Sequence, residues 1–314
     1  MDIIFHSAGA NPELWQTALQ QAMPDANMRL WQEGDIAPAD YALVWKPPAT
    51  MLRGRTDLKA IFNLGAGVDA ILHLGDALPA GVPVVRLDDA GMGLQMAEFV
   101  AHAVLRYFRR LDDYARQNQQ QIWRSLMPYE KKDFSIGVLG LGVLGLGVLG
   151  NRIIDALRGF DFPINGWSRT QKNLSGVSCY AGQDQLDQFL SASRVLVVIL
   201  PLTTETEDLL DKAKLVQLPK GAYVINVARG AHLIEADLLD LIQQGHIAGA
   251  TLDVFREEPL PPAHPFWQEP RITITPHISA LTMRDESARQ IAEKIKALQN
   301  GLPIAGLVDQ SRGY

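Results

Sequence analysis

Three polar residues in the second half of the chain have the types that proton transfer and carboxylate binding require: Arg229, Glu258 and His277. An imidazole suits a general acid because its unperturbed pKa is about 6.5. A carboxylate at Glu258 can hydrogen-bond the far ring nitrogen and fix the ring. The forked guanidinium of Arg229 can pin a substrate carboxylate and polarise the neighbouring carbonyl.

Each of these residues closely follows an apolar run that is typical of a buried strand. Ligands of open α/β sheets bind beyond the carboxyl ends of such strands, so the three side chains are expected at one edge of a sheet. A lone histidine is more often structural than catalytic. That interpretation applies to the other histidines, which are His6, His73, His102, His232, His246 and His264.

A glycine ladder, GLGVLGLGVLG at 140–150, lies between an apolar run and an amphipathic segment with Ile153, Ile154 and Leu157 on one face. Strand, Gly-x-Gly-x-x-Gly and helix together indicate a dinucleotide site. The glycines let backbone N–H groups approach a pyrophosphate at the positive end of the helix. Hydride transferred from a nicotinamide to a ketone carbon leaves negative charge on the oxygen, which His277 could then protonate.

The ladder repeats, so the motif fits either 140/142/145 or 145/147/150. The second register places the first glycine closer to the typical distance of about 20 residues from the ribose-binding position. It also lets Leu141–Leu144 replace Ile136–Leu139 as the buried strand, with the surplus residues in a loop near 130–134. We therefore predict Gly145, Gly147 and Gly150, the alternative being that one copy bulges and the first register binds.

Enzymes that use NAD place a carboxylate at the end of the second strand of this motif, where it holds the ribose 2′-hydroxyl. Here the chain has Ser168, Arg169 and Thr170, followed by Lys172. A guanidinium with two hydroxyls would hold a 2′-phosphate, which predicts NADP(H). The alternative is a solvated arginine in a turn. Further cofactor contacts are expected at Val148, Leu149, Pro201, Thr206, Ala228 and Asp253.

The order of apolar runs predicts an α/β fold with two domains, each a doubly wound parallel sheet. We expect a Rossmann-type nucleotide domain at 99–282 and a smaller, flavodoxin-like substrate domain at 1–98 plus 283–314. One long helix is predicted from Gly91 to Gln121, and a last helix from Thr282 to Gln299. The predicted strands are 2–5, 28–31, 41–45, 61–64, 84–87, 195–200, 223–227, 250–254 and 272–275, and the first helix is 12–22.

The totals exclude some classes of protein. A net charge of −6 argues against nucleic acid or an anionic membrane as the main partner. The single cysteine, Cys179, cannot form an internal disulfide and favours a reducing compartment. No apolar run reaches the roughly 18 residues of a membrane helix, and no basic leader precedes the first strand. We expect a cytoplasmic protein without a metal site.

The chain resembles the D-isomer-specific 2-hydroxyacid dehydrogenases over essentially its whole length, and within them the bacterial glyoxylate/hydroxypyruvate reductase A group. The resemblance lies in the glycine ladder and in LGAGVD (64–69), WSRT (167–170), NVARG (226–230), LDVFREEPL (252–260) and TPH (275–277). The departure is the five extra residues in the ladder.

The resemblance implies that Arg229 binds and polarises the substrate, that Glu258 supports the acid and that His277 donates the proton. It implies a substrate site formed by the amides of Ala66, Gly67 and Val68, lined by Trp45 and Met92. It further implies a homodimer built on the nucleotide domains, and a cleft between two hinged lobes.

The resemblance therefore predicts NADPH-dependent reduction of small 2-keto acids, glyoxylate to glycolate and hydroxypyruvate to glycerate. Two alternatives stay open: a dinucleotide-sensing binding protein of the same fold, and a dehydrogenase for another 2-hydroxy acid such as D-lactate. Substrate ranking, physiological direction and the role of the tail do not follow from these residues.

Overall fold

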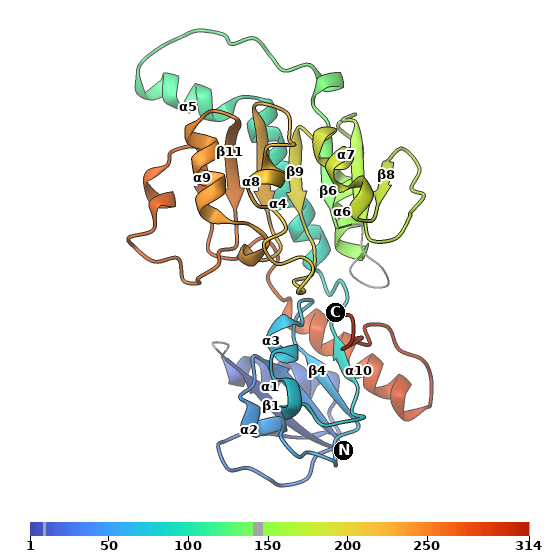
Figure 1. Ribbon diagram of the computed structural model, residues 1–314. Helices are drawn as coiled ribbons and strands as arrows, with labels where there is room; N and C mark the ends of the chain where they lie inside the picture. Colours follow the sequence, from blue (N-terminus) through green and yellow to red (C-terminus); the bar gives the residue numbers. More distant parts are fainter. Residues whose placement is uncertain (9–10, 141–146, 314) are drawn as a thin grey trace. The chain divides into compact units, whose positions relative to one another are not determined.

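The computed structural model describes residues 1–8, 11–140 and 147–313. The chain forms two compact units: unit 1 comprises residues 1–92 and 282–314, and unit 2 comprises residues 93–281. Each contains one parallel sheet with helices (Figure 1). The predicted α/β fold with two doubly wound parallel sheets is confirmed.

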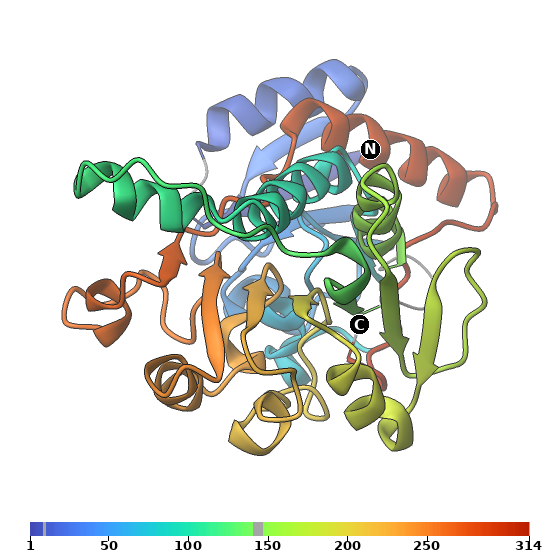
Figure 2. The same cartoon turned by 90° about the horizontal axis from the view of Figure 1, so that it is seen from above.

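Unit 1 has a five-stranded parallel sheet in the order β2-β1-β3-β4-β5, which is the flavodoxin-like order. Side chains such as Ile4, Val44 and Ile61 are fully buried in its core. Helices α1 and α10 pack against each other although they lie near opposite ends of the chain (Figure 2). The elements are β1 (Asp2–Ser7), α1 (Pro12–Ala22), β2 (Asn27–Leu30), β3 (Tyr41–Trp45), α2 (Ala49–Leu52), β4 (Ala60–Asn63), α3 (Asp69–Leu72), η1 (Gly75–Ala77), β5 (Val84–Arg86) and α10 (Arg284–Gln299).

Unit 2 has a seven-stranded parallel sheet in the order β12-β11-β10-β9-β6-β7-β8. Its elements are α4 (Met92–Phe108, which starts at the last residue of unit 1), α5 (Leu111–Gln119), η2 (Lys131–Asp133), β6 (Ile136–Leu139), α6 (Gly147–Arg158), β7 (Ile164–Ser168), β8 (Ser178–Ala181), η3 (Gln183–Gln185), α7 (Leu186–Ser191), β9 (Val195–Val198), α8 (Lys212–Leu215), β10 (Ala222–Asn226), η4 (Gly230–His232), α9 (Glu235–Gln243), β11 (Ile247–Leu252), η5 (Pro265–Gln268) and β12 (Ile272–Ile274).

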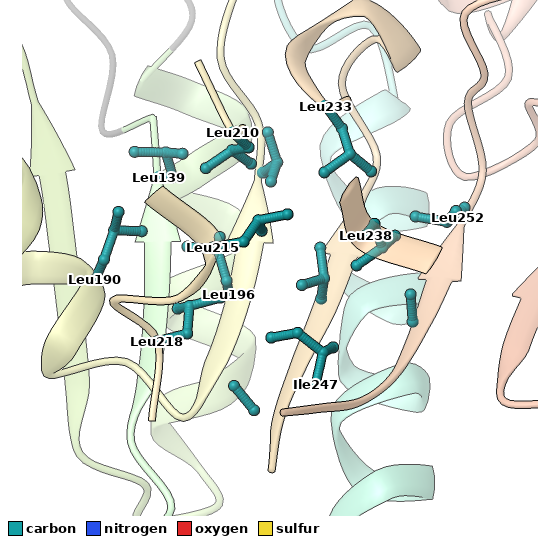
Figure 3. Close-up of a cluster of buried hydrophobic side chains, with 14 of the residues drawn as sticks. Leu139, Leu190, Leu196, Leu210, Leu215, Leu218, Leu233, Leu238, Ile247 and Leu252 are labelled. Carbon is teal, nitrogen blue, oxygen red and sulfur yellow. The ribbon is translucent and has the colours of Figure 1, made fainter. Parts of the chain in front are cut away.

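Helices cover both faces of this sheet, with α4 and α6 on one face and α7, α8 and α9 on the other (Figure 2). Leucines from strands and helices fill the second face, including Leu139, Leu196 and Leu238 (Figure 3). The chain leaves β6 in one direction along the sheet and β9 in the other. The crevice beyond the carboxyl ends of β6 and β9 is therefore the topological switch point at which such sheets bind ligands.

The predicted helix from Gly91 to Gln121 is wrong as a single element. It is broken between α4 and α5, where Arg110 adopts a left-handed conformation with φ of 58°. The Arg110 Nε donates to Asp113 at 2.7 Å, and the Arg106 Nε donates to Asp112 at 2.8 Å. The residues after Phe108 are mostly polar, so continuing the helix would bury little apolar surface.

The last helix begins at Arg284, two residues later than predicted. The hydroxyl of Thr282 does not cap it but donates to the Leu64 carbonyl at 3.2 Å. After α10 the tail runs along β5 of the same unit, where the Val308 amide donates to the Val84 carbonyl at 2.9 Å. The part of the tail up to Val308 therefore docks on β5.

Candidate active site

The structure brings Glu258 and His277 into contact at the carboxyl edge of the unit 2 sheet. The loops after β10, β11 and β12 carry Arg229, Glu258 and His277, and these three strands are neighbours in the sheet. The His277 Nδ1 lies 2.8 Å from Glu258 Oε2, and the second Glu258 oxygen accepts from the Phe255 amide at 3.0 Å. With Nδ1–H donating to Glu258, the His277 Nε2 is the ring nitrogen left for proton transfer.

The Glu258 carboxyl is held in its ionised form. Partial burial raises its pKa, but the hydrogen bonds from His277 and the Phe255 amide, with the charges of His277 and Arg229, outweigh burial and lower the pKa below its usual value. Arg229 is therefore close enough for its charge to act on this carboxylate. Its Nη1 donates to the Ala228 carbonyl at 2.7 Å, while Asn226 Nδ2 donates to the Arg229 carbonyl at 2.9 Å.

Asp253 holds the turn that presents His277. Its carboxylate is fully buried and accepts from Thr275 Oγ1 at 2.6 Å and from the Ile278 and Ser279 amides at 2.8 Å each. His277 itself has φ of 55°, a conformation that few non-glycine residues adopt, and its amide donates to the Asp253 carbonyl at 2.9 Å. Asp253 is among the cofactor contacts expected from the sequence, and that role stays a prediction. The support that it gives to His277 was not foreseen.

Glycines allow close packing where strand β6 meets helix α6, at the predicted nucleotide site. Gly140 follows β6 with φ of 128°, and a Cβ there would lie 2.8 Å from the backbone of Ile199. A Cβ on Gly150 would lie 3.1 Å from the Gly140 carbonyl oxygen, so α6 packs closely against the end of the strand. Gly147 is the first residue of α6, while Gly145 lies outside the described residues. The side chain of Leu149 is buried.

The predicted displacement of the strand is wrong. Ile136–Leu139 is the buried strand and pairs with β7 and β9, whereas residues 141–144, which were expected to form it, lie outside the described residues. The segment near 130–134 is no surplus loop either: it contains η2 and ends in the buried Phe134. The bounds of strand β6 thus agree with the first register, and the start of α6 agrees with the second.

Arg169 follows β7 and lies beside the loop after β9. Its Nη1 is 3.8 Å from Glu205 Oε2, and its side chain is 38% exposed, so it is accessible to an anion. The Ser168 side chain is buried and donates to the Thr170 carbonyl at 2.8 Å. In the β9 loop, the Thr206 hydroxyl donates to the Pro201 carbonyl at 2.7 Å. Ala228 is buried at the start of the β10 loop.

In unit 1, Trp45 and the loop after β4 meet at the carboxyl edge of the sheet. A Cβ on Gly65 would lie 2.5 Å from the Trp45 ring, so only glycine fits against it. Asn63 shapes the rest of this loop, since its Nδ2 donates to the carbonyls of Gly65 at 3.0 Å and Gly67 at 2.8 Å. Ala66 and Gly67 are partly exposed, whereas the side chains of Val68 and Met92 are buried.

Within the described residues, no group of three or more His, Cys, Asp or Glu side chains could hold a metal ion. The same part of the chain contains no helix long and apolar enough to cross a membrane.

Residues 101–279 match the family model of the D-isomer specific 2-hydroxyacid dehydrogenase NAD binding domain. The chain belongs to this family of dehydrogenases. It is 50% identical over 319 residues to glyoxylate/hydroxypyruvate reductase A of Yersinia enterocolitica, with all of both chains covered. It is also 50% identical over 318 residues to the protein of that name from Serratia proteamaculans, again over the full length of both.

Solved structures of 2-hydroxyacid dehydrogenases are also similar to this chain. A 2-hydroxyacid dehydrogenase of Xanthobacter autotrophicus in complex with NADPH and MES superposes with a TM-score of 0.93 at 41% identity, covering 100% of this chain and 99% of that one. The NADPH-dependent glyoxylate/hydroxypyruvate reductase of Sinorhizobium meliloti, solved with NADP and sulfate, gives a TM-score of 0.92 at 33% identity with the same coverage.

Proposed function

We propose that this protein catalyses the NADPH-dependent reduction of small 2-keto acids, glyoxylate to glycolate and hydroxypyruvate to glycerate. The observation that carries the proposal is the His277–Glu258 pair, with the charge of Arg229 acting on it, at the carboxyl ends of three neighbouring strands. The names and bound cofactors of the full-length relatives support the substrates and the cofactor.

The described residues fit a dinucleotide. Gly140 and Gly150 leave no room for side chains where α6 meets β6, and the partly exposed Arg169 provides a cation for a 2′-phosphate. When bound, the cofactor supplies hydride. Arg229 pins the substrate carboxylate and polarises its keto group, and His277 donates a proton from Nε2 to the substrate oxygen. Glu258 keeps the ring oriented and accepts its Nδ1–H.

In unit 1, the amides of Ala66, Gly67 and Val68 hold the substrate carboxylate in this proposal, and Trp45 and Met92 line the site. The support is local: Asn63 fixes the conformation of this loop by donating to the carbonyls of Gly65 and Gly67.

NADPH oxidation by the purified protein in the presence of glyoxylate tests the proposal. We expect turnover with glyoxylate and hydroxypyruvate and a lower KM for NADPH than for NADH. Tight NADPH binding without turnover would support a dinucleotide sensor instead. Turnover of pyruvate to D-lactate in preference to both keto acids would support a lactate dehydrogenase.

We also propose a homodimer, formed through α5 and the segment that follows it. This arm projects from the body of unit 2 (Figure 2) and is held by Arg110 Nη1, which donates to the Met127 carbonyl at 3.1 Å. Its apolar side chains are exposed to an unusual degree: Leu111 50%, Ile122 45%, Met127 81% and Trp123 fully. Light scattering after gel filtration should give twice the chain mass, and Trp123→Ser with Met127→Ser should give a monomer. A monomeric wild-type protein would refute the dimer.

We place the protein in the cytoplasm, in line with its single cysteine. Cell fractionation should recover it with the cytosolic proteins.

A further inference from the structure

His232 is a buried imidazole that the proposed reaction does not use. It lies on η4, three residues after Arg229, and none of its surface is exposed. Its Nδ1 is 2.9 Å from the Thr206 carbonyl oxygen, and its Nε2 is 3.0 Å from the Leu200 carbonyl oxygen. Both ring nitrogens therefore face backbone oxygens, which can only accept hydrogen bonds.

A neutral imidazole cannot satisfy two such acceptors, because it has one N–H and one lone pair. In the neutral ring, the lone pair of one nitrogen would face the lone pairs of a carbonyl oxygen at hydrogen-bond distance, which is repulsive. The imidazolium has an N–H on each side, and hydrogen bonds from a charged donor are the stronger kind. We infer that His232 is held as the doubly protonated cation. Given the proposed function, it acts as a positioning residue whose two ring N–H groups fix the conformation of the cofactor loop after β9.

The segment held by His232 is Leu200–Thr206, and the imidazole ring contacts the carbonyl oxygens of its first and last residues. Thr206, at one of these ends, also closes the turn, since its hydroxyl donates to the Pro201 carbonyl at 2.7 Å and accepts from the Thr203 amide at 2.9 Å. The residue before this segment, Ile199, lies against Gly140, where an added Cβ would be 2.8 Å from its backbone. Because the segment follows β9, we expect it to form one wall of the crevice at the switch point. One side chain thus sets the shape of a loop that faces the cofactor.

Backbone hydrogen bonds also connect the residues after the cofactor loop to the segment that carries Arg229, the arginine proposed to bind the substrate. The Asp208 amide donates to the Ala231 carbonyl at 2.8 Å, and the Leu210 amide donates to the His232 carbonyl at 2.9 Å. Arg229 precedes these residues in the same short segment. Displacement of His232 is therefore expected to disturb the cofactor loop and Arg229 together.

Nitrogen-15 NMR of the full chain at neutral pH tests the protonation state directly. Imidazolium gives two ring nitrogens of similar chemical shift, whereas a neutral tautomer gives two widely separated shifts. The His232 signals are assigned by their loss in His232→Asn. Similar shifts that persist without cofactor support the inference, and the widely separated pair of a neutral ring would overturn it.

Substitutions test the positioning role of His232. The amide nitrogen of Asn can take the place of Nδ1 and keep the bond to Thr206, and that of Gln can take the place of Nε2 and keep the bond to Leu200. His232→Leu keeps neither. We expect its NADPH dissociation constant to rise about tenfold or more, and those of Asn and Gln to rise less. His73→Asn, at an exposed histidine whose Nδ1 is 2.7 Å from one carbonyl oxygen, is the matched control and should bind like wild type.

A merely structural histidine would lower the free energy of unfolding in these variants but leave the NADPH dissociation constant of the folded protein unchanged, and that result would overturn the inference. If His232→Leu does not fold, Asn and Gln carry the same comparison. A wild-type protein that binds no NADPH would refute the proposed function, while the NMR signature would still decide the state of the ring.

Discussion

The two ends of the unit 2 sheet edge are built differently. At the β10–β12 end, the residues proposed to contact the substrate are held by side-chain hydrogen bonds: Asp253 fixes the His277 turn and Glu258 fixes the ring. At the β6–β7 end, glycine backbone and the accessible Arg169 take that place. Orienting a proton donor requires a rigid network, whereas binding a flexible diphosphate requires close backbone and a mobile cation. Substitutions at the first end should therefore damage turnover, and those at the second should damage cofactor binding.

The largest effect is expected from His277→Ala. Loss of a general acid lowers turnover by roughly 100-fold or more, with little change in NADPH affinity. Steady-state kinetics with glyoxylate and a separate NADPH titration distinguish the two. His73→Ala, at an exposed histidine of unit 1, should be silent. Near-normal turnover of His277→Ala would remove this residue from the mechanism.

Gly230→Ala should disturb the β10–β12 end of the sheet edge by forcing the backbone of two loops apart. A Cβ there would lie 1.9 Å from the Phe255 carbonyl carbon, so the loops after β10 and β11 must separate and carry Arg229 away from Glu258. We expect a loss of about 1–3 kcal/mol in the free energy of unfolding, and a fall in turnover. Gly159→Ala, where no atom lies within 4 Å of the added Cβ, is the matched control. Equal stability of the two variants in urea denaturation would contradict the close approach.

Arg169→Ala should weaken cofactor binding at the β6–β7 end of the sheet edge and leave the β10–β12 end unchanged. Loss of charge-assisted hydrogen bonds to a 2′-phosphate should raise the dissociation constant of NADPH about tenfold or more and leave that of NADH nearly unchanged. Fluorescence titration with both cofactors measures the ratio. An equal loss for both cofactors would show that Arg169 does not read the 2′-phosphate.

The smallest effect concerns pH. Because the folded state lowers the pKa of Glu258, its ionised carboxylate contributes stability above the ordinary value of 4.5, and this contribution is lost as the pH falls through the folded pKa. The difference in the free energy of unfolding between wild type and Glu258→Gln should therefore be largest near neutral pH and shrink below about pH 4.5. Glu257→Gln, at the exposed neighbour, is the control. A difference that grows in acid would contradict the sign of the shift.

Residue patterns predicted the strands well, because uninterrupted apolar runs such as 195–200 have few alternatives in a buried parallel sheet. They could not place the strand before the glycine ladder. The two copies at 136–139 and 141–144 both read apolar-Gly-Val-Leu, so the pattern does not tell them apart. In the structure Gly137 packs closely, since an added Cβ would lie 2.1 Å from Ser193 Oγ. Ser193 stands 56 positions after Gly137 (193 − 137), so the local sequence pattern does not reveal this contact.

Other misses have the same origin in contacts between distant or non-periodic residues. The break at Arg110 depends on ion pairs and on the polar side chains after Phe108, which a helical period does not reveal. The support of His277 by Asp253 joins residues on neighbouring strands. His232 looked like an ordinary structural histidine, and the two carbonyl oxygens beside its ring nitrogens, which the sequence does not reveal, suggest a more specific role.

The most direct test is a crystal structure of the full chain with NADP and oxamate, an unreactive mimic of a 2-keto acid. The account predicts that His277 Nε2 and the Arg229 guanidinium both lie within hydrogen-bond distance of the oxamate, with His277 still bonded to Glu258. An oxamate bound away from both side chains, or a His277 ring whose Nε2 faces away from it, would contradict the account.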